Sequence, residues 1–213
     1  MDQAAAVLLL RRPAAAAGPA LSPLSALALR AGQGDDDAFD QLMISTQDRI
    51  LGLAWRLLGN SEDARDAAQE TYLRVYRHLG RYRPEHDFEA WLYRIAVNVC
   101  KDFYRHRQKR PTVHHWNAES PAGQNLEPRS ESDSEQRTLA SERRRLVFEA
   151  LATLSPRQRA ALVLHDLEGK TSEQVAKILG SRPGTVRSQL SAGRSRLKRA
   201  LVLLMSRGRR KVR

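Results

Sequence analysis

Cysteine is almost absent from this sequence, since Cys100 is the only one in 213 residues. A single cysteine forms no internal disulfide and no thiolate zinc site, and it is compatible with a reducing compartment. No apolar run approaches the roughly 18 residues of a membrane span. The early AAAVLLL stretch follows Asp2 instead of a basic segment and is therefore a poor signal peptide. We expect a soluble, cytoplasmic protein with no membrane insertion of its own.

Motifs for catalysis and cofactor binding are also missing. No P-loop pattern occurs, and His114 and His115 have no cysteine or carboxylate partners at metal-ligand spacing. An enzyme acting on nucleic acid would need a convergent acidic or metal-binding cluster, which the sequence does not offer. We expect no catalytic residues, no metal and no cofactor, and we predict that the protein is not an enzyme.

Acidic residues are outnumbered by basic ones. The chain has 36 Lys and Arg against 24 Asp and Glu, which gives a formal net charge of +12. Such a balance favours a polyanionic partner. Nucleic acid and an anionic membrane surface both fit, and composition alone does not choose between them.

The spacing of apolar residues predicts an all-helical fold, because no strand pattern of note appears. Within residues 24–110 the apolar positions recur at intervals of three, four and seven. Gly59 and Asn60 are expected to end the first long helix of this region. Ser61 is expected to cap the free amides of the next helix, which runs to about Leu79.

A further helix begins at Phe88, after a loop that contains Pro84. Trp91 belongs to its apolar side, which we assign to the core. The other side is a polar stripe made of Arg94, Asn98, Lys101 and Arg105.

Two small helical domains joined by a flexible linker account for the composition along the chain. The early stretch rich in Ala and Pro can bury little apolar surface, so we predict a disordered extension, with an overlong start as the alternative. The later stretch of Pro, Ser, Asn, Gln and Glu has the composition of a solvated, flexible linker. The predicted divisions are a disordered extension at 1–23, a first domain at 24–110, a linker at 111–138, a second domain at 139–204 and a basic tail at 205–213.

The second domain contains a predicted helix-turn-helix. Thr171 and Gln174 form a T-x-x-Q capping box, Gly180 ends a short helix in a left-handed conformation, and Pro183 starts another. The second helix has Val186, Leu190, Gly193 and Leu197 on one face and Thr185, Arg187, Ser188, Ser191, Arg194 and Arg199 on the other. A basic outer face on the second helix is typical of a recognition helix that enters the major groove. A solvated face of an ordinary helical hairpin is the alternative.

Three segments in order resemble one family. DARDAAQE (63–70), FEAWLYRIAVN (88–98) and LSPRQRAALVLHDLEGKTSEQVAKILGSRPGTVRSQL (154–190) are similar to motifs of the extracytoplasmic-function (ECF) group of bacterial sigma factors, within the sigma-70 family. The resemblance covers residues 24–201. It implies a region 2 that binds RNA polymerase and the −10 promoter element, and a region 4 that binds the −35 element about two helical turns away.

The resemblance also assigns residues in the first domain. It implies that the helix with Asp63, Asp66, Gln69 and Glu70 docks on the β′ subunit of core polymerase. Acidic and amide groups are poor DNA ligands, which agrees with a protein partner, although a merely solvated helix start is the alternative.

For the −10 element, the resemblance implies that Asn98 helps hold a base turned out of the stack, because its amide both donates and accepts hydrogen bonds. Tyr82 corresponds to an aromatic residue near that strand, or else packs on its own domain. Phosphate contacts are then expected from Arg94, Lys101, Arg105, Arg107 and Arg110.

For the −35 element, Arg187 and Ser188 correspond to family contact positions, and arginine is well suited to guanine O6 and N7. Relatives carry a basic or aromatic pair where this chain has Ser191, Ala192 and Gly193. We therefore predict an altered or weaker −35 preference. The remaining predicted −35 contacts are Arg182, Thr185, Ser191 and Arg194.

The resemblance also implies a path for the linker and one further partner. The linker would pass through polymerase, where Glu127, Glu131, Asp133 and Glu135 could mimic nucleic acid. The family also implies an anti-sigma protein that holds the chain inactive. The competing hypothesis is a stand-alone helix-turn-helix regulator that binds DNA as a dimer.

Overall fold

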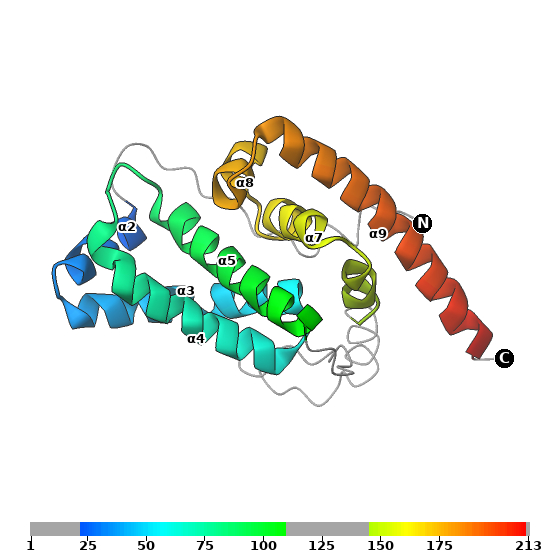
Figure 1. Cartoon of the computed structure of the whole chain (residues 1–213), viewed down its shortest axis with the longest axis horizontal. Coiled ribbons are helices and arrows are strands. Elements are labelled where there is room, and N and C mark those ends of the chain that lie inside the picture. The colour runs from blue at the N-terminus through cyan, green and yellow to red at the C-terminus, as the bar shows by residue number, and fades with distance from the viewer. Residues whose placement is uncertain (1–21, 110–144, 212–213) are drawn as a thin grey trace, which may run out of the picture.

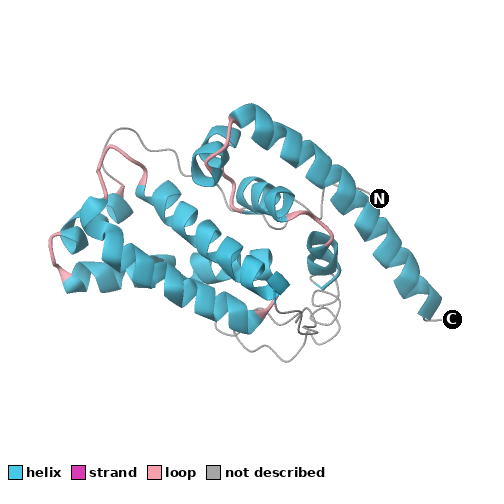
Figure 2. Ribbon diagram, viewed as in Figure 1, coloured by secondary structure: helices cyan, strands magenta, loops and turns pink. Residues whose placement is uncertain are grey.

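Helices account for the regular structure of the chain, in agreement with the predicted all-helical class (Figures 1 and 2). The computed structural model describes residues 22–109 and 145–211, and no strand occurs within those two ranges. The predicted linker and most of the predicted N-terminal extension, with the histidine pair and the four acidic linker residues, lie outside the described residues. Their roles stay predictions.

The first half of the chain is a bundle of helices joined by short turns. Its elements are α2 (Pro23–Gly32), α3 (Asp36–Leu58), α4 (Ser61–His78), the 3₁₀ turn η1 (Leu79–Arg81) and α5 (Phe88–Lys109). The apolar side of α3 packs inward as predicted, with Leu42, Ile50 and Leu53 buried.

The junction between α3 and α4 corrects one detail of the sequence prediction. Gly59 ends α3 in the left-handed conformation, with a φ of 73°. The cap of α4 is Asn60 and not Ser61, because the Asn60 side chain accepts hydrogen bonds from the backbone N–H groups of Glu62 and Asp63. Asparagine ranks with serine as an N-cap, and Asn60 has the extended backbone conformation that a cap needs, with a φ of −134° and a ψ of 134°.

The second half begins with helical residues 145–152, followed by α7 (Pro156–Leu162), a π-helical turn η2 (Val163–Leu167), α8 (Ser172–Leu179) and α9 (Pro183–Lys211). Ser155 with Gln158 and Thr171 with Gln174 form reciprocal capping boxes. The second of these confirms the predicted start of α8. Helix α9 continues through residue 204, the predicted end of the second domain.

The two halves pack against each other, and buried residues from both belong to one apolar cluster. The ring of Trp55 from α3 lies 3.8 Å from that of Phe148, measured between centroids. Helix α8 lies beside α5, and Figure 1 shows α7, α8 and α9 grouped on the α5 side of the bundle. The division at residues 110 and 139 therefore stays a prediction about the chain, while the described parts form a continuous core.

We expect opposite effects from two glycine substitutions in the helix-turn-helix. Gly180 has a φ of 60° and ends α8, so Gly180→Ala should lower the free energy of unfolding by about 1 kcal/mol. Gly184 lies in the first turn of α9 with open space where a Cβ would be, so Gly184→Ala should raise it by up to about 1 kcal/mol. Urea unfolding monitored by circular dichroism measures both, and a stabilising Gly180→Ala would contradict the assigned turn.

Candidate nucleic-acid interface

The helix-turn-helix has the geometry that the sequence predicts. Gly180 donates its backbone N–H to the C-terminal carbonyls of α8, and α9 begins three residues later at Pro183. Val186 and Leu190 are only 1% and 4% exposed and fix α9 on the rest of the fold. The predicted −35 contacts lie on the exposed side: Arg182, Thr185, Arg187, Ser188, Ser191 and Arg194.

Unlike Arg182 and Arg187, Arg194 forms an ion pair with another side chain of the described residues. Its Nε and one Nη contact both carboxylate oxygens of Asp166 in η2, at 3.0 and 2.5 Å. Burial would raise the pKa of Asp166, but hydrogen bonds from Arg194 and His165 outweigh it and hold the pKa below its usual value. Asp166 therefore stays ionised and keeps Arg194 beside η2, a contact that spans 28 residues of sequence.

Gly193 faces inward, so it is not one of the missing DNA contacts. A Cβ at this position would lie 3.3 Å from Leu162 Cδ1 and 3.6 Å from Gln158 Cβ. The glycine thus lets α9 approach α7 closely. Ser191 and Ala192 are exposed, and they are the two positions where an altered −35 preference could arise.

The polar stripe of α5 is also exposed as predicted. It comprises Arg94, Asn98, Lys101 and Arg105. The Arg105 guanidinium is 4.0 Å from Asp102, an exposed pair that contributes little to stability. Two further arginines were predicted to contact phosphates. The Arg107 guanidinium donates to Asp63 and to the Leu58 carbonyl. Arg110 lies outside the described residues.

Tyr82 is a core residue, and its predicted stacking on promoter bases does not fit this position. Its side chain is 8% exposed, and its ring packs edge-on against Phe88 with centroids 5.2 Å apart. The hydroxyl donates to the His86 carbonyl at 2.7 Å and lies 3.1 Å from the Ser25 hydroxyl oxygen. A tyrosine with a buried ring and a satisfied hydroxyl has no reason to leave the core. Trp91 packs beside it, in agreement with its assignment to the core.

The acidic stretch of α4 divides into paired and unpaired groups. Asp63 accepts from Arg107 at 3.4 Å, and Glu70 accepts from Arg74 at 2.7 Å. Asp66 and Gln69 are exposed and have no side-chain partner within the described ranges. Gln69 also borders a groove of about 230 Å³ between α3 and α4.

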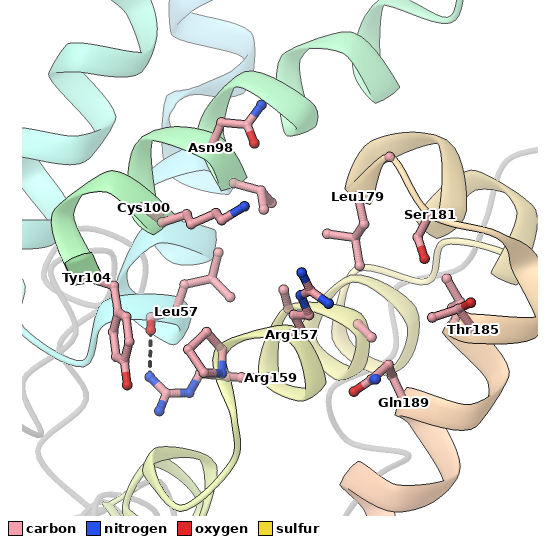
Figure 3. Close-up of a pocket in the computed structure, with 17 residues that line it drawn as sticks. Leu57, Asn98, Cys100, Tyr104, Arg157, Arg159, Leu179, Ser181, Thr185 and Gln189 are labelled. Atoms are coloured by element: carbon pink, nitrogen blue, oxygen red, sulfur yellow. Dashed lines mark hydrogen bonds between the residues drawn. The ribbon is translucent and has the colours of Figure 1, made fainter.

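A cavity of about 250 Å³ brings together residues from both predicted DNA-binding surfaces. Figure 3 shows Asn98 of α5 on one side and Thr185 and Gln189 of α9 on the other. Lys101 and Arg157 also line it. Sequence reasoning missed Gln189, although it lies one helical turn after Thr185 and its amide could have been recognised as a base-reading group.

The positive charge of the chain is concentrated at its C-terminal end. From residue 174 onward there is no Asp or Glu and there are twelve basic residues, equal to the whole net charge of +12. These are Lys177, Arg182, Arg187, Arg194, Arg196, Lys198, Arg199, Arg207, Arg209, Arg210, Lys211 and Arg213. A helix with this charge attracts phosphates before any base is read.

The described residues contain neither a metal-binding cluster nor a membrane-spanning helix. No group of three or more His, Cys, Asp or Glu side chains there could hold a metal ion. None of the described helices is long and apolar enough to cross a membrane.

Comparisons with known proteins place both halves in one family. Residues 42–110 match Sigma-70 region 2, and residues 144–197 match Sigma-70, region 4. The RNA polymerase sigma-H factor of Pseudomonas aeruginosa is 35% identical over 83% of this chain and 92% of its own length. The ECF RNA polymerase sigma-E factor of Haemophilus influenzae is 33% identical over 84% of this chain and 96% of its own length.

Solved structures agree on the fold. CnrH, solved in complex with the cytosolic domain of CnrY, has a TM-score of 0.63 at 22% identity and covers 84% of this chain and 97% of its own. The sigma factor RpoE of Bartonella quintana, solved with the anti-sigma factor NepR, has a TM-score of 0.58 at 23% identity, over 76% of this chain and 96% of its own. With region 2 and region 4 matched in order and near-complete relatives above 30% identity, the chain belongs to the ECF group of the sigma-70 family of RNA polymerase sigma factors.

Proposed function

We propose that this chain directs core RNA polymerase to promoters by reading a −10 element with α5 and a −35 element with α9. The observation that carries the proposal is the exposed polar face of α9, which holds Arg182, Thr185, Arg187, Ser188 and Ser191 above an apolar face buried in the fold. The expectation that the chain reads a −10 and a −35 element comes from its family membership. Residues 24–110 and 139–204 would be the two binding domains.

At the −35 element, Arg187 is the main candidate for direct base reading. It lies in the second turn of α9, and the N-terminal residues of a recognition helix are those that reach base edges. Ser188 and Thr185 supply hydroxyls beside it. Arg194 would contact DNA only by sharing its guanidinium with Asp166 or by releasing that carboxylate.

At the −10 element, Asn98 is the candidate that reads an extruded base, because it is exposed in the middle of the basic stripe. Arg94, Lys101 and Arg105 would contact phosphates on either side. No nucleotide hydrolysis is invoked, since binding of the single-stranded bases would stabilise the melted state. The protein would therefore act without catalysis of its own, in the cytoplasm with polymerase.

Core polymerase would bind the acidic stretch of α4. Asp66 and Gln69 are the free groups of this surface, and Asp63 and Glu70 are held by arginines of the same half. The adjoining groove contains Met43, Leu51 and Tyr72, so a partner helix could bury apolar side chains beside the acidic ones. CnrH and RpoE were solved with protein partners, and we propose that an anti-sigma protein likewise regulates this chain.

The direct test is reconstitution with purified core polymerase, followed by run-off transcription on a genomic library. We expect initiation at a limited set of start sites that share two sequence elements. Binding of the chain to core polymerase without any defined start site would contradict the proposal. Tight binding to promoter DNA as a dimer without polymerase would favour the stand-alone regulator instead.

Substitution of Arg187 tests the −35 assignment. A bidentate arginine–guanine contact contributes about 1–3 kcal/mol of discrimination, so Arg187→Ala should lower transcription from −35-dependent promoters by about tenfold or more. Arg187→Lys keeps the charge but loses the planar fork, and it should lose base preference while retaining part of the affinity.

Arg199→Ala is the matched control, since it removes the same charge farther along the exposed part of α9. It should weaken binding evenly across −35 sequences without changing which base is preferred. If the Arg187→Ala chain still protected the −35 element in footprinting as the unsubstituted chain does, Arg187 would not belong to the −35 site.

Charge reversal tests the polymerase surface. Asp66→Arg should raise the Kd for core polymerase about tenfold, because an exposed carboxylate in the proposed docking stretch pairs with positive charge on the partner, and the substitution replaces that attraction with repulsion. Asp40→Arg makes the same change near the start of α3, also on an exposed residue, and should leave the Kd unchanged. Fluorescence anisotropy of the labelled chain measures both, and equal effects of the two variants would show a general charge effect only.

A further inference from the structure

The cavity of about 250 Å³ between the two halves has apolar walls. Val97 of α5, Ala161 of α7, and Leu179 and Val186 of the helix-turn-helix line it. Water beside such walls makes few hydrogen bonds with them, so its displacement by an apolar group is favourable. The cavity therefore fits a ligand with an apolar body.

Polar side chains from both halves border the same space. Figure 3 shows Asn98 of α5 on one side and Ser181, Thr185 and Gln189 on the other. Hydroxyl and amide groups donate hydrogen bonds to the oxygen atoms of a ligand. A few polar groups around a mostly apolar cavity are the usual composition of a small-molecule site.

The charged side chains at the cavity are all basic. Lys101, Arg157 and Arg159 line it, and its lining residues include no Asp or Glu. No carboxylate of the described ranges forms an ion pair with Lys101 or Arg157. Positive charge that gathers at one cavity without a carboxylate among the lining residues favours an anionic ligand.

The most deeply placed of these cations is Arg159. Its side chain is 5% exposed, and burial lowers the pKa of its guanidinium, since a charge is costly away from water. The guanidinium donates to the backbone carbonyl of Leu57, which also lines the cavity. An anion held in the cavity would lower the cost of this buried charge.

The size of the cavity and its access to solvent limit the kind of ligand. An apolar cavity of about 150 Å³ is large enough to bind benzene, so this space has room for about two fused rings. Sites for drug-sized molecules are larger, at about 300–1,000 Å³. Asn98, Lys101, Arg157 and Thr185 are exposed, so a ligand can enter from solvent without a rearrangement of the helices.

We propose that this cavity binds a small aromatic anion, whose acidic group pairs with Lys101 and Arg157 while its rings pack against Val97, Leu179 and Val186. The inference goes beyond the proposed function, because the site needs neither polymerase nor promoter DNA. A bare inorganic anion would leave the apolar walls in contact with water, and an uncharged ring compound would form no ion pair. Both parts of the ligand are therefore needed for affinity.

Isothermal titration calorimetry of the full-length chain with three probes tests the chemistry of the site. The probe 1-naphthoate has two fused rings and a carboxylate, 1-naphthamide has the same shape without the charge, and acetate has the charge without the rings. For 1-naphthoate we expect a Kd of about 1 mM or below. The Kd should be about tenfold higher for 1-naphthamide and higher still for acetate. Equal Kd values for 1-naphthoate and 1-naphthamide, or no binding of 1-naphthoate, would overturn the proposal.

The substitution Arg157→Ala locates the site. Arg157 is exposed and has no assigned DNA contact, so its removal should leave the fold intact. An exposed ion pair changes affinity by up to about fivefold, so the Kd for 1-naphthoate should rise by about threefold to fivefold. Arg77→Ala is the matched control, because Arg77 is an exposed arginine of α4 that does not line the cavity, and it should leave the Kd unchanged. Equal effects of the two variants would show attraction to the net charge only and would overturn the proposal.

A double variant with Lys101→Ala and Arg157→Ala separates the charged part of the site from the apolar part. Both side chains are exposed, so circular dichroism should show unchanged helicity. The two naphthyl probes should then bind with similar Kd values, because only the contacts with their rings remain. A preference for 1-naphthoate that persists in the folded double variant would overturn the proposal. None of these titrations uses polymerase or DNA, so their failure would leave the proposed function standing.

Discussion

One buried guanidinium holds the architecture together. Arg159 of α7 is 5% exposed, and burial lowers the pKa of its side chain. It donates to the Leu57 carbonyl in the last turn of α3 at 2.7 Å (Figure 3). It also donates to the carbonyls of Leu151, Ala152 and Leu154. Helix C-termini leave carbonyls without partners and carry partial negative charge, so a cation there compensates both. The end of α3 and the end of the 145–152 helix are thereby fixed to α7.

This arrangement determines where the helix-turn-helix lies. Because α7 is anchored to α3, η2 follows at a fixed place, and Glu168 and Lys170 come into reach of α5. Helix α8 then packs beside α5, and α9 is held on α7 by the close approach at Gly193. The same contacts therefore place Thr185 and Gln189 of α9 across one cavity from Asn98 and Lys101 of α5.

Sequence periodicity predicted much of the local structure because its causes are local. Capping by Thr171, chain reversal at Gly180 and the inward face of α9 depend on residues within a turn or two of each other. The cap of α4 was assigned to Ser61 instead of Asn60, because both types cap well and only the backbone conformation distinguishes them. Tyr82 could be a stacking platform or a core residue by sequence, and its hydrogen bonds to Ser25 and His86 decide for the core. The pairing of Arg194 with Asp166 had no sequence signal, since nothing local links η2 to the middle of α9.

By itself the sequence determined the helical class, the positions of the turns, the inner and outer faces of α9 and, through its motifs, membership of the ECF group. Each of these follows from spacing along the chain or from residue identity in a short window. Only the tertiary structure decided which exposed groups are free, which are paired, and that the two predicted DNA-binding surfaces share one cavity. Those outcomes depend on contacts such as Glu168 with Tyr93, 75 residues apart in sequence, whose energies exist only once the helices are packed.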